Sequence, residues 1–227
     1  MAASPAKDAA KRKFMIGILM IEFGIIKMIL LSQRSKLSGK NEVGMIQTHG
    51  NRVTGVSKKD AGRSIDSCDG LLTNDPEIFL TISVADCIPL ALFDSVTGSI
   101  GLVHAGWRGL DGKIIKNAVD LMIKNFSVKP ENLQAEIGPH ICQKHYEVKG
   151  GVAARFFEYP DAVRHTKGKM FLDLAKVAED QLENCGIPPK NIKVEKHCTY
   201  EDPSLPSYRR GDMKKRVYYL LRVPNSS

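Results

Sequence analysis

Short apolar runs recur along the chain from about residue 41 onward and predict a series of strands. Each run is rich in Val, Ile, Leu and Phe, the composition of strands in a buried sheet. The segment between residues 93 and 99 consists of turn-forming residues and predicts a hairpin between its two neighbours. The predicted strands cover residues 78–84, 90–93, 99–104, 133–137, 192–196 and 217–223.

Two segments show the helical period instead. One helix is expected to begin after an N-cap at Asp111, and the other near Leu174, ending at Gly186 before two prolines. Short strands interleaved with few helices predict a mixed α/β fold, a sandwich of mixed β-sheet flanked by helices. The apolar stripes of the two helices are Ile114, Ile115, Ala118, Leu121, Met122 and Phe126, and Val177, Ala178 and Leu182.

The N-terminal part of the chain has a different pattern. Residues 1–13 are small, polar and basic, which is typical of a disordered lead-in, and residues 14–31 are apolar apart from Glu22 and Lys27. A basic lead before an apolar run also resembles a signal peptide or membrane anchor. Each charge near a bilayer centre costs about 3 kcal/mol, so buried elements of a soluble fold are favoured and an anchor stays the alternative. We therefore divide the chain into residues 1–40 and a single domain over 41–227.

Composition narrows the class of protein. With 227 residues, 43% of them hydrophobic and 26% charged, the chain is long and apolar enough for a globular core. Its five cysteines form an odd set without a C-x-x-C pair, which favours free thiols in a reducing compartment, the cytoplasm.

A net charge of +8 is typical of proteins that bind nucleic acid, but the position of the charges along the chain decides whether that interpretation applies. Residues 1–40 carry 8 basic and 2 acidic side chains, and residues 209–227 carry 6 and 1. The span between them has 19 basic against 22 acidic side chains. The basic excess belongs to the two ends, so no nucleic-acid partner is predicted.

Reactive side chains gather beside glycines in three motifs. Cys87 lies just beyond one predicted strand and His104 ends another, so rigid backbone can aim both side chains into a shared cleft. The motifs are Gln47-Thr-His-Gly50, Ala85-Asp-Cys-Ile-Pro89 and His104-Ala-Gly-Trp-Arg-Gly109.

Two kinds of chemistry compete for these residues. His49, Cys87 and His104 have the donor atoms of a catalytic zinc site with an open fourth position, and the thiolate also suits copper. Alternatively, Cys87 is a nucleophile with His104 as its base, oriented by a carboxylate such as Asp86. The spacings of 38 and 17 residues match no compact metal motif, so isolated residues remain a third possibility.

Arginines are the candidates for binding an anion. Arg209 and Arg210 end a loop rich in turn formers, and an arginine fork binds phosphate or carboxylate with two hydrogen bonds. Arg108 lies beside a predicted helix start, where anions are favoured. For each of them a solvated surface position is the alternative. Cys142 and Cys185 are expected to be small core fillers.

Seven motifs occur together in one order, and as a set they resemble the YfiH family. These laccase-domain proteins are described as multicopper polyphenol oxidases and as purine nucleoside phosphorylases. The resemblance runs from about residue 40 to the C-terminus. Beyond the three motifs above, the set contains Ile137-Gly-Pro-His-Ile141 with Tyr146-Glu-Val148, Leu172-Asp-Leu174, Cys198-Thr199 and Ser207-Tyr-Arg-Arg210.

The resemblance implies a specific enzyme. The family metal site maps onto His49, Cys87 and His104, with zinc as the usual ion and copper in the older description. The implied activity is phosphorolysis of adenosine, inosine and methylthioadenosine, with adenosine deamination as a second reaction. The partners are then a purine nucleoside and inorganic phosphate. The implied fold is an α/β sandwich shared with toxin deamidases.

The leading hypothesis is therefore a metal-dependent purine nucleoside enzyme with a catalytic domain over residues 41–227. Arg108, Arg209 and Arg210 would bind phosphate or ribose, and Asp86 would accept a proton. One alternative is a metal-free cysteine hydrolase or deamidase that uses Cys87 and His104. A second is a non-catalytic binding member, associated with membranes through residues 14–31.

Two segments depart from the family pattern. The expected Thr-Arg pair and Leu-Asn-x-Gly element are missing from the N-terminal region, where the apolar run stands. After Arg210 the chain continues Gly211-Asp-Met-Lys-Lys-Arg216 in place of Asp-Gly and Thr-Gly-Arg. Substrate contacts from both segments are therefore expected to differ from those of the family.

Overall fold

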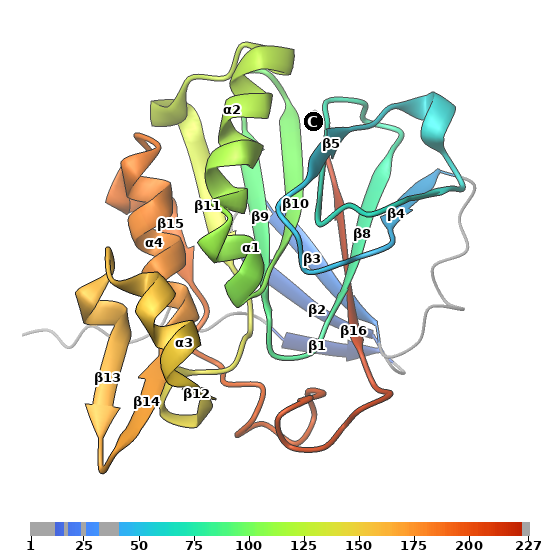
Figure 1. Ribbon diagram of the computed structural model, residues 1–227. Coiled ribbons are helices and arrows are strands. Elements are labelled where there is room, and N and C mark those ends of the chain that lie inside the picture. Colours follow the sequence, from blue (N-terminus) through green and yellow to red (C-terminus); the bar gives the residue numbers. More distant parts are fainter. Residues whose placement is uncertain (1–11, 16–17, 24–25, 32–40, 224–227) are drawn as a thin grey trace, which may run out of the picture.

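The computed structural model describes residues 41–223 in full and residues 12–15, 18–23 and 26–31 as backbone strands (Figure 1). The described chain forms a seven-stranded sheet, a six-stranded sheet and a small three-stranded sheet. Helices α1, α2 and α4 lie along one face of the six-stranded sheet, and the seven-stranded sheet lies behind its other face (Figure 1). The mixed α/β sandwich flanked by helices is confirmed.

The seven-stranded sheet has the order β1–β2–β3–β16–β8–β4–β6. Most of its neighbours are antiparallel, but β4 pairs in parallel with both β8 and β6. Its strands are β1 Arg12–Met15, β2 Ile18–Phe23, β3 Ile26–Leu31, β16 Val217–Arg222, β8 Phe79–Val84, β4 Glu42–Met45 and β6 Ser64–Ile65.

The six-stranded sheet has the order β15–β11–β9–β10–β7–β5 and is mixed in direction, whereas the small sheet is antiparallel in the order β12–β14–β13. The strands of the larger one are β15 Ile192–Val194, β11 Leu133–Ile137, β9 Ile88–Asp94, β10 Ser99–Ala105, β7 Gly70–Thr73 and β5 Val53–Gly55. The small sheet contains β12 Glu147–Val148, β14 Lys169–Leu172 and β13 Val163–Thr166.

The helices are short and are grouped on one side of the molecule. The α-helices are α1 Trp107–Asp111, α2 Ile114–Phe126, α3 Gly150–Ala153 and α4 Leu174–Asn184. Single turns of 3₁₀ helix occupy Lys58–Asp60, Pro130–Asn132, Gln143–His145, Ala154–Phe156, Pro160–Ala162 and Pro189–Asn191.

The central strands β9 and β10 are buried at every position. Leu90 and Leu92 point to the helices, while Ala91 and Phe93 pack against the seven-stranded sheet. A strand covered on both faces needs apolar residues on both, so it reads as a continuous apolar run rather than an alternating one. This is why these two strands, which carry the candidate site at their ends, could be predicted, and their antiparallel hairpin is confirmed.

The helix predictions hold with one correction. Buried Ile114, Ile115, Ala118, Val119 and Met122 form the inner face of α2. The N-cap of that helix is not Asp111 but Lys113, which adopts a left-handed conformation with φ 58°. Asp111 instead ends the short helix α1, and its carboxylate pairs with Arg155 at 2.7 Å. The sequence pattern missed the short helix α1 and placed the start of α2 two residues too early.

The apolar N-terminal run adds strands to the larger sheet. Strands β2 and β3 form an antiparallel pair, and β3 pairs with β16 through Leu30 opposite Tyr219. The predicted boundary at residue 40 therefore does not separate these strands from the C-terminal strand of the domain. Most of the predicted lead-in, residues 1–11, lies outside the described residues. Among the described residues, no helix has the length and apolarity needed to cross a membrane.

Close packing between the layers makes Gly101 sensitive to substitution. In Gly101→Ala the added Cβ would lie 2.7 Å from Leu72 Cδ2 and 3.4 Å from Leu92 Cβ, both in the core. Overpacking of this kind costs about 1–3 kcal/mol, so the midpoint of chemical denaturation should fall. Gly151→Ala is the control because a Cβ there meets nothing within 4 Å. Equal midpoints for the two variants would contradict this packing.

Candidate functional site

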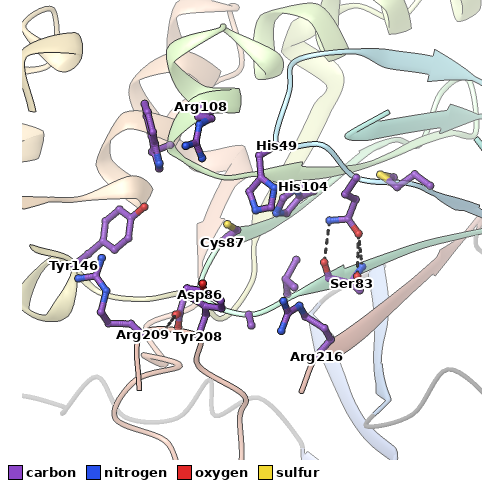
Figure 2. A pocket seen from close by; sticks show the side chains of 15 residues that line it. His49, Ser83, Asp86, Cys87, His104, Arg108, Tyr146, Tyr208, Arg209 and Arg216 are labelled. Carbon is purple, nitrogen blue, oxygen red and sulfur yellow. Dashed lines mark hydrogen bonds between the residues drawn. The ribbon is translucent and has the colours of Figure 1, made fainter. Parts of the chain in front are cut away.

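The three glycine-containing motifs meet at one cavity of about 610 Å³ (Figure 2). His49 follows β4, Cys87 lies between β8 and β9, and His104 is the penultimate residue of β10. Segments distant in sequence thus bring their side chains to one place. The lining residues are Met45, Gln47, His49, Ser83, Val84, Ala85, Asp86, Cys87, His104, Trp107, Arg108, Tyr146, Tyr208, Arg209 and Arg216.

The loop that carries His49 is tied to the neighbouring strand by Gln47. The Gln47 Nε2 donates to the Ser83 carbonyl at 2.9 Å, and its Oε1 accepts from the Ser83 amide and hydroxyl, both at 3.0 Å. His49 itself has φ 58°, a left-handed conformation that non-glycine residues adopt rarely. The strain is held by this network and places the imidazole over the cavity.

Asp69, which was not predicted from the sequence, hydrogen-bonds to both histidines, to the backbone of His49 and to the ring of His104. Its Oδ1 accepts hydrogen bonds from the His49 amide at 3.0 Å and lies 2.8 Å from His104 Nδ1. Its Oδ2 accepts from the Gly50 amide at 2.8 Å and from the amide and hydroxyl of Thr48. Asp69 is fully buried and directly precedes β7, where no motif distinguishes it from an ordinary turn aspartate.

The bond to Asp69 sets the orientation of His104. Because Nδ1 faces the carboxylate, Nε2 is the nitrogen left for the cavity. A carboxylate behind a histidine is the usual arrangement that fixes a metal-ligating imidazole. Burial would raise the pKa of Asp69, but hydrogen bonds from His104 and Gly50 hold it below its usual range.

Two glycines of the third motif are required by close contacts. A Cβ on Gly106 would lie 2.9 Å from Cys87 Sγ, and one on Gly109 would lie 2.9 Å from the Gly50 carbonyl. Both distances are shorter than real Cβ contacts allow. The predicted close backbone approach beside Trp107 is therefore present, and it brings β10 up against the cysteine.

His49, Cys87 and His104 are close enough to share one ion. Their donor atoms all lie within 4.8 Å of one another, and the two imidazole rings meet edge to face with centroids 4.8 Å apart. Zinc binds thiolate sulfur at about 2.3 Å and imidazole nitrogen at about 2.0 Å, so donors spaced in this way fit around it. The soft sulfur and two nitrogens also suit copper.

The same three residues polarise each other in the absence of an ion. Burial alone would raise the pKa of the Cys87 thiol, but the charge of His104 and hydrogen bonds from both histidines lower it to about 6. Burial would lower the pKa of His104, but Cys87 and Asp69 raise it to about 9. Each group thus favours the charged form of the other, thiolate for Cys87 and imidazolium for His104, when no ion is bound.

Asp86 lines the cavity, but its carboxylate is committed to holding a loop. Its Oδ1 accepts from the Thr199 hydroxyl at 2.6 Å and its Oδ2 from the Arg209 amide at 2.8 Å. The residue has φ 80° and is 6% exposed. Both oxygens are occupied, which disfavours the predicted role of proton acceptor; the carboxylate fixes the loop that follows Cys198.

The three predicted arginines divide into two groups. Arg108 and Arg209 line the cavity, with guanidinium groups over the rings of Trp107 at 4.5 Å and Tyr146 at 5.0 Å. Arg216, which was not predicted individually, also lines the cavity and belongs to the segment that departs from the family pattern.

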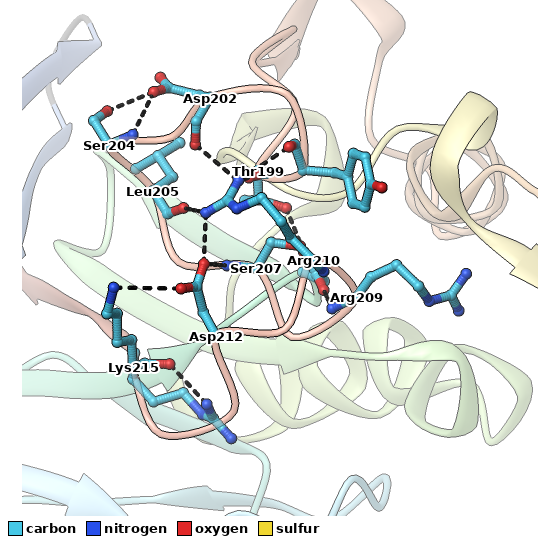
Figure 3. Close-up of polar contacts among 12 residues, drawn as sticks. Thr199, Asp202, Ser204, Leu205, Ser207, Arg209, Arg210, Asp212 and Lys215 are labelled. Carbon is cyan, nitrogen blue, oxygen red and sulfur yellow. Dashed lines mark hydrogen bonds and ion pairs between the residues drawn. The ribbon is translucent and has the colours of Figure 1, made fainter.

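Arg210 is outside this group, because its side chain does not line the cavity as predicted. Its guanidinium points into its own loop (Figure 3). It donates to the carbonyls of Thr199, Tyr200, Asp202 and Leu205 and pairs with Asp212 at 2.6 Å. Neighbouring arginines in a loop point in opposite directions, so the Tyr-Arg-Arg motif contains one cavity residue and one loop anchor.

Comparison with known proteins places the chain among relatives with two described activities. It is 36% identical over 172 residues to a purine nucleoside phosphorylase of Staphylococcus epidermidis, and 39% identical over 159 residues to one of Deinococcus radiodurans. It is 34% identical over 166 residues to an adenosine deaminase, RL5, of an unknown prokaryotic organism. The alignments cover 70%, 69% and 67% of this chain and 64%, 61% and 63% of the relatives. The chain thus spans less than two thirds of their length.

Solved structures share the fold over nearly the whole chain. The hypothetical protein YfiH of Bacillus licheniformis matches with a TM-score of 0.82 at 25% identity, covering 95% of this chain and 97% of that one. YlmD of Geobacillus stearothermophilus has the same fold, with a TM-score of 0.85 at 23% identity and coverage of 94% and 98%.

The family follows from the extent of the match and from the motifs together. Residues 28–218 match the family model described as multi-copper polyphenol oxidoreductase laccase. That range contains all seven motifs, the cavity and the three clustered donors. The chain belongs to this laccase-like family, the YfiH family that its motifs resemble.

Proposed function

We propose that the chain is a metal-dependent enzyme acting on purine nucleosides. It would cleave adenosine, inosine or methylthioadenosine with inorganic phosphate and deaminate adenosine as a second reaction. The observation that carries the proposal is the convergence of His49, Cys87 and His104 on the floor of a cavity with arginines in its wall. The activities of the relatives named above support both reactions.

The three converging residues would hold zinc, or copper in its place. Bound zinc supplies Lewis acidity at the open coordination position. His104 presents Nε2 because Asp69 binds Nδ1, and Cys87 is already polarised toward thiolate by both histidines. An ion bound here would displace the proton from His104 Nε2, because that nitrogen needs its lone pair to ligate a metal.

The wall of the cavity fits the two parts of the substrate. Tyr146, Tyr208 and Trp107 offer ring faces to a purine, and Arg108, Arg209 and Arg216 offer positive charge to phosphate. In phosphorolysis the bond from C1′ to N9 breaks, a bond from C1′ to a phosphate oxygen forms, and the released purine takes a proton. Positioning phosphate beside C1′ is the task that these arginines would perform.

The proposal includes the compartment of the enzyme and its partners. All five cysteines are free thiols, which supports a reducing compartment, and we expect the protein in the cytoplasm. We expect a purine nucleoside and inorganic phosphate as the partners of this cavity, and no nucleic-acid partner.

Removal of a proposed ligand tests the function directly. His49→Ala and Cys87→Ala should lose measurable turnover of adenosine and inosine, with and without phosphate, followed by chromatography of the products. Bound metal in the purified variants should fall in parallel. Cys185→Ala is the matched control, since that thiol lies at the end of α4, away from the cavity. Unchanged product formation in both ligand variants would rule the assignment out.

Asp69 is a positioning residue, and its test separates metal affinity from folding. In Asp69→Asn the amide group replaces an acceptor of backbone N–H groups and removes the charge behind His104. Zinc affinity, measured by competition with a chromophoric chelator, should fall about 10- to 100-fold. Asp66→Asn is the control because that carboxylate is exposed. An Asp69→Asn protein that unfolds at the wild-type temperature and binds zinc equally well would contradict this role.

A metal-free cysteine enzyme is the second candidate, because Cys87 and His104 favour each other's charged forms and Asp69 binds Nδ1 of the same imidazole. This order of thiol, imidazole and carboxylate is the arrangement of a cysteine nucleophile with an oriented base. The carboxylate is Asp69 rather than Asp86, the residue predicted from the sequence. The chemistry would then be hydrolysis or deamidation.

Chelation and alkylation distinguish the two candidates. In the metal-free chain, iodoacetamide should modify Cys87 at pH 7 ahead of Cys185, because the pKa of Cys87 is lowered to about 6 and that of Cys185 is raised. Peptide mass spectrometry measures both sites in one sample. The leading proposal requires that a chelator abolish turnover and that zinc restore it. Turnover that survives chelation and is lost on alkylation of Cys87 would favour the cysteine enzyme.

A further inference from the structure

A second cluster of metal-binding atoms lies outside the trio at the cavity. The thiols of Cys142 and Cys198 and a carboxylate oxygen of Glu201 all lie within 4.8 Å of one another. Cys198 is buried, Cys142 is half-buried and Glu201 is exposed, so the cluster opens to solvent on one side only. The sequence predicted Cys142 as a core filler, which does not account for this grouping.

The backbone holds the two cysteines together independently of their side chains. Residues His140 and Cys198 form an isolated parallel bridge, and the Thr199 amide donates to the His140 carbonyl at 3.0 Å. The Cys142 amide then donates to Cys198 Sγ at 3.2 Å. An N–H group aimed at a sulfur stabilises the thiolate form, the form in which cysteine binds a metal.

Two side chains contact the carboxylate of the cluster from its exposed side. Lys144 Nζ lies 3.1 Å and His145 Nε2 2.8 Å from Glu201 Oε1. Neither of these contacts involves the second carboxylate oxygen, Oε2.

We propose that Cys142, Cys198 and Glu201 form a second metal site, for a thiophilic divalent cation such as zinc. Two sulfurs and one carboxylate oxygen supply three ligands, and water fills the fourth position of a tetrahedral ion. Since the ring of His145 is bonded to Glu201 and stacked on Tyr200, it stays outside the coordination shell.

The place of this site in the fold makes it structural. It joins the loop that leads to Tyr146 with the loop that leads to Arg209, and these two side chains stack at 5.0 Å in the cavity wall. Thr199, next to Cys198, also bonds Asp86 beside the candidate catalytic cysteine. An ion bound here would link these two loops of the cavity wall to each other. The inference does not depend on the identity of the substrate.

Cobalt spectroscopy on the full chain tests the site. Thiolate-bound Co²⁺ absorbs strongly in the near ultraviolet, and a Cys87→Ser background removes the thiolate of the first site. Metal-stripped Cys87→Ser protein titrated with Co²⁺ should develop this absorption and should bind close to one ion per chain. Adding Cys142→Ser should abolish both, whereas adding Cys185→Ser, a half-buried thiol elsewhere, should change neither.

A charge variant keeps the test independent of cysteine packing. Glu201→Gln should weaken cobalt binding at this site by about tenfold or more, since a ligand and its charge are lost. Glu147→Gln, an exposed carboxylate paired with Lys169, is its control. Thermal unfolding without metal checks that the variants fold alike.

Three results would overturn the proposal. One is the absence of thiolate absorption in the Cys87→Ser protein, and another is the same absorption with and without Cys142. The third is a Cys142–Cys198 disulfide, detected by intact mass in protein purified without reductant, because a bonded pair cannot supply two thiolates.

Discussion

The site depends on one buried carboxylate. Asp69 is fully buried, and an ionised group in that position is tolerated only when its oxygens are satisfied. The donors come from the turn that carries His49 and from the ring of His104. The interaction that stabilises the charge is therefore also the one that sets the distance between the two histidines and the tautomer of one of them. Stability and site geometry are not separable here.

The layered fold explains why so rigid a site can stand at strand ends. Strands β9 and β10 are covered by helices on one face and by a second sheet on the other, so their ends cannot shift without moving two cores. Cys87 and His104 lie at those ends, whereas Arg209 and Tyr146 belong to loops that hydrogen bonds and the stacked pair hold in place. Two of the three proposed ligands thus lie at the ends of doubly covered strands, whereas part of the cavity wall belongs to loops fixed by polar contacts.

A site residue could be predicted from the sequence only where its own local motif is distinctive. His49, Cys87 and His104 carry distinctive chemistry beside glycines, so their motifs predicted the cluster that the structure brings together. Asp69 acts through hydrogen bonds to residues about 20 and 35 positions away in the chain, and Arg216 reaches the cavity only through the fold, so local pattern contains no sign of either. Arg210 was placed wrongly because its motif does not tell which of two adjacent arginines turns inward.

The cysteines show most clearly that local sequence does not define the role of a residue. In two clusters of this fold, the pKa of a cysteine thiol is shifted in opposite directions. Cys87 faces two imidazoles, which lower its pKa to about 6, whereas Cys142 faces a thiol and a carboxylate, and its pKa is raised to about 11. The charge of His104 polarises the Cys87 thiol toward thiolate even without an ion. The second cluster combines two thiols with a carboxylate, the donor atoms of the proposed second metal site. A thiol's role is thus set by the charge opposite it, which only the folded chain defines.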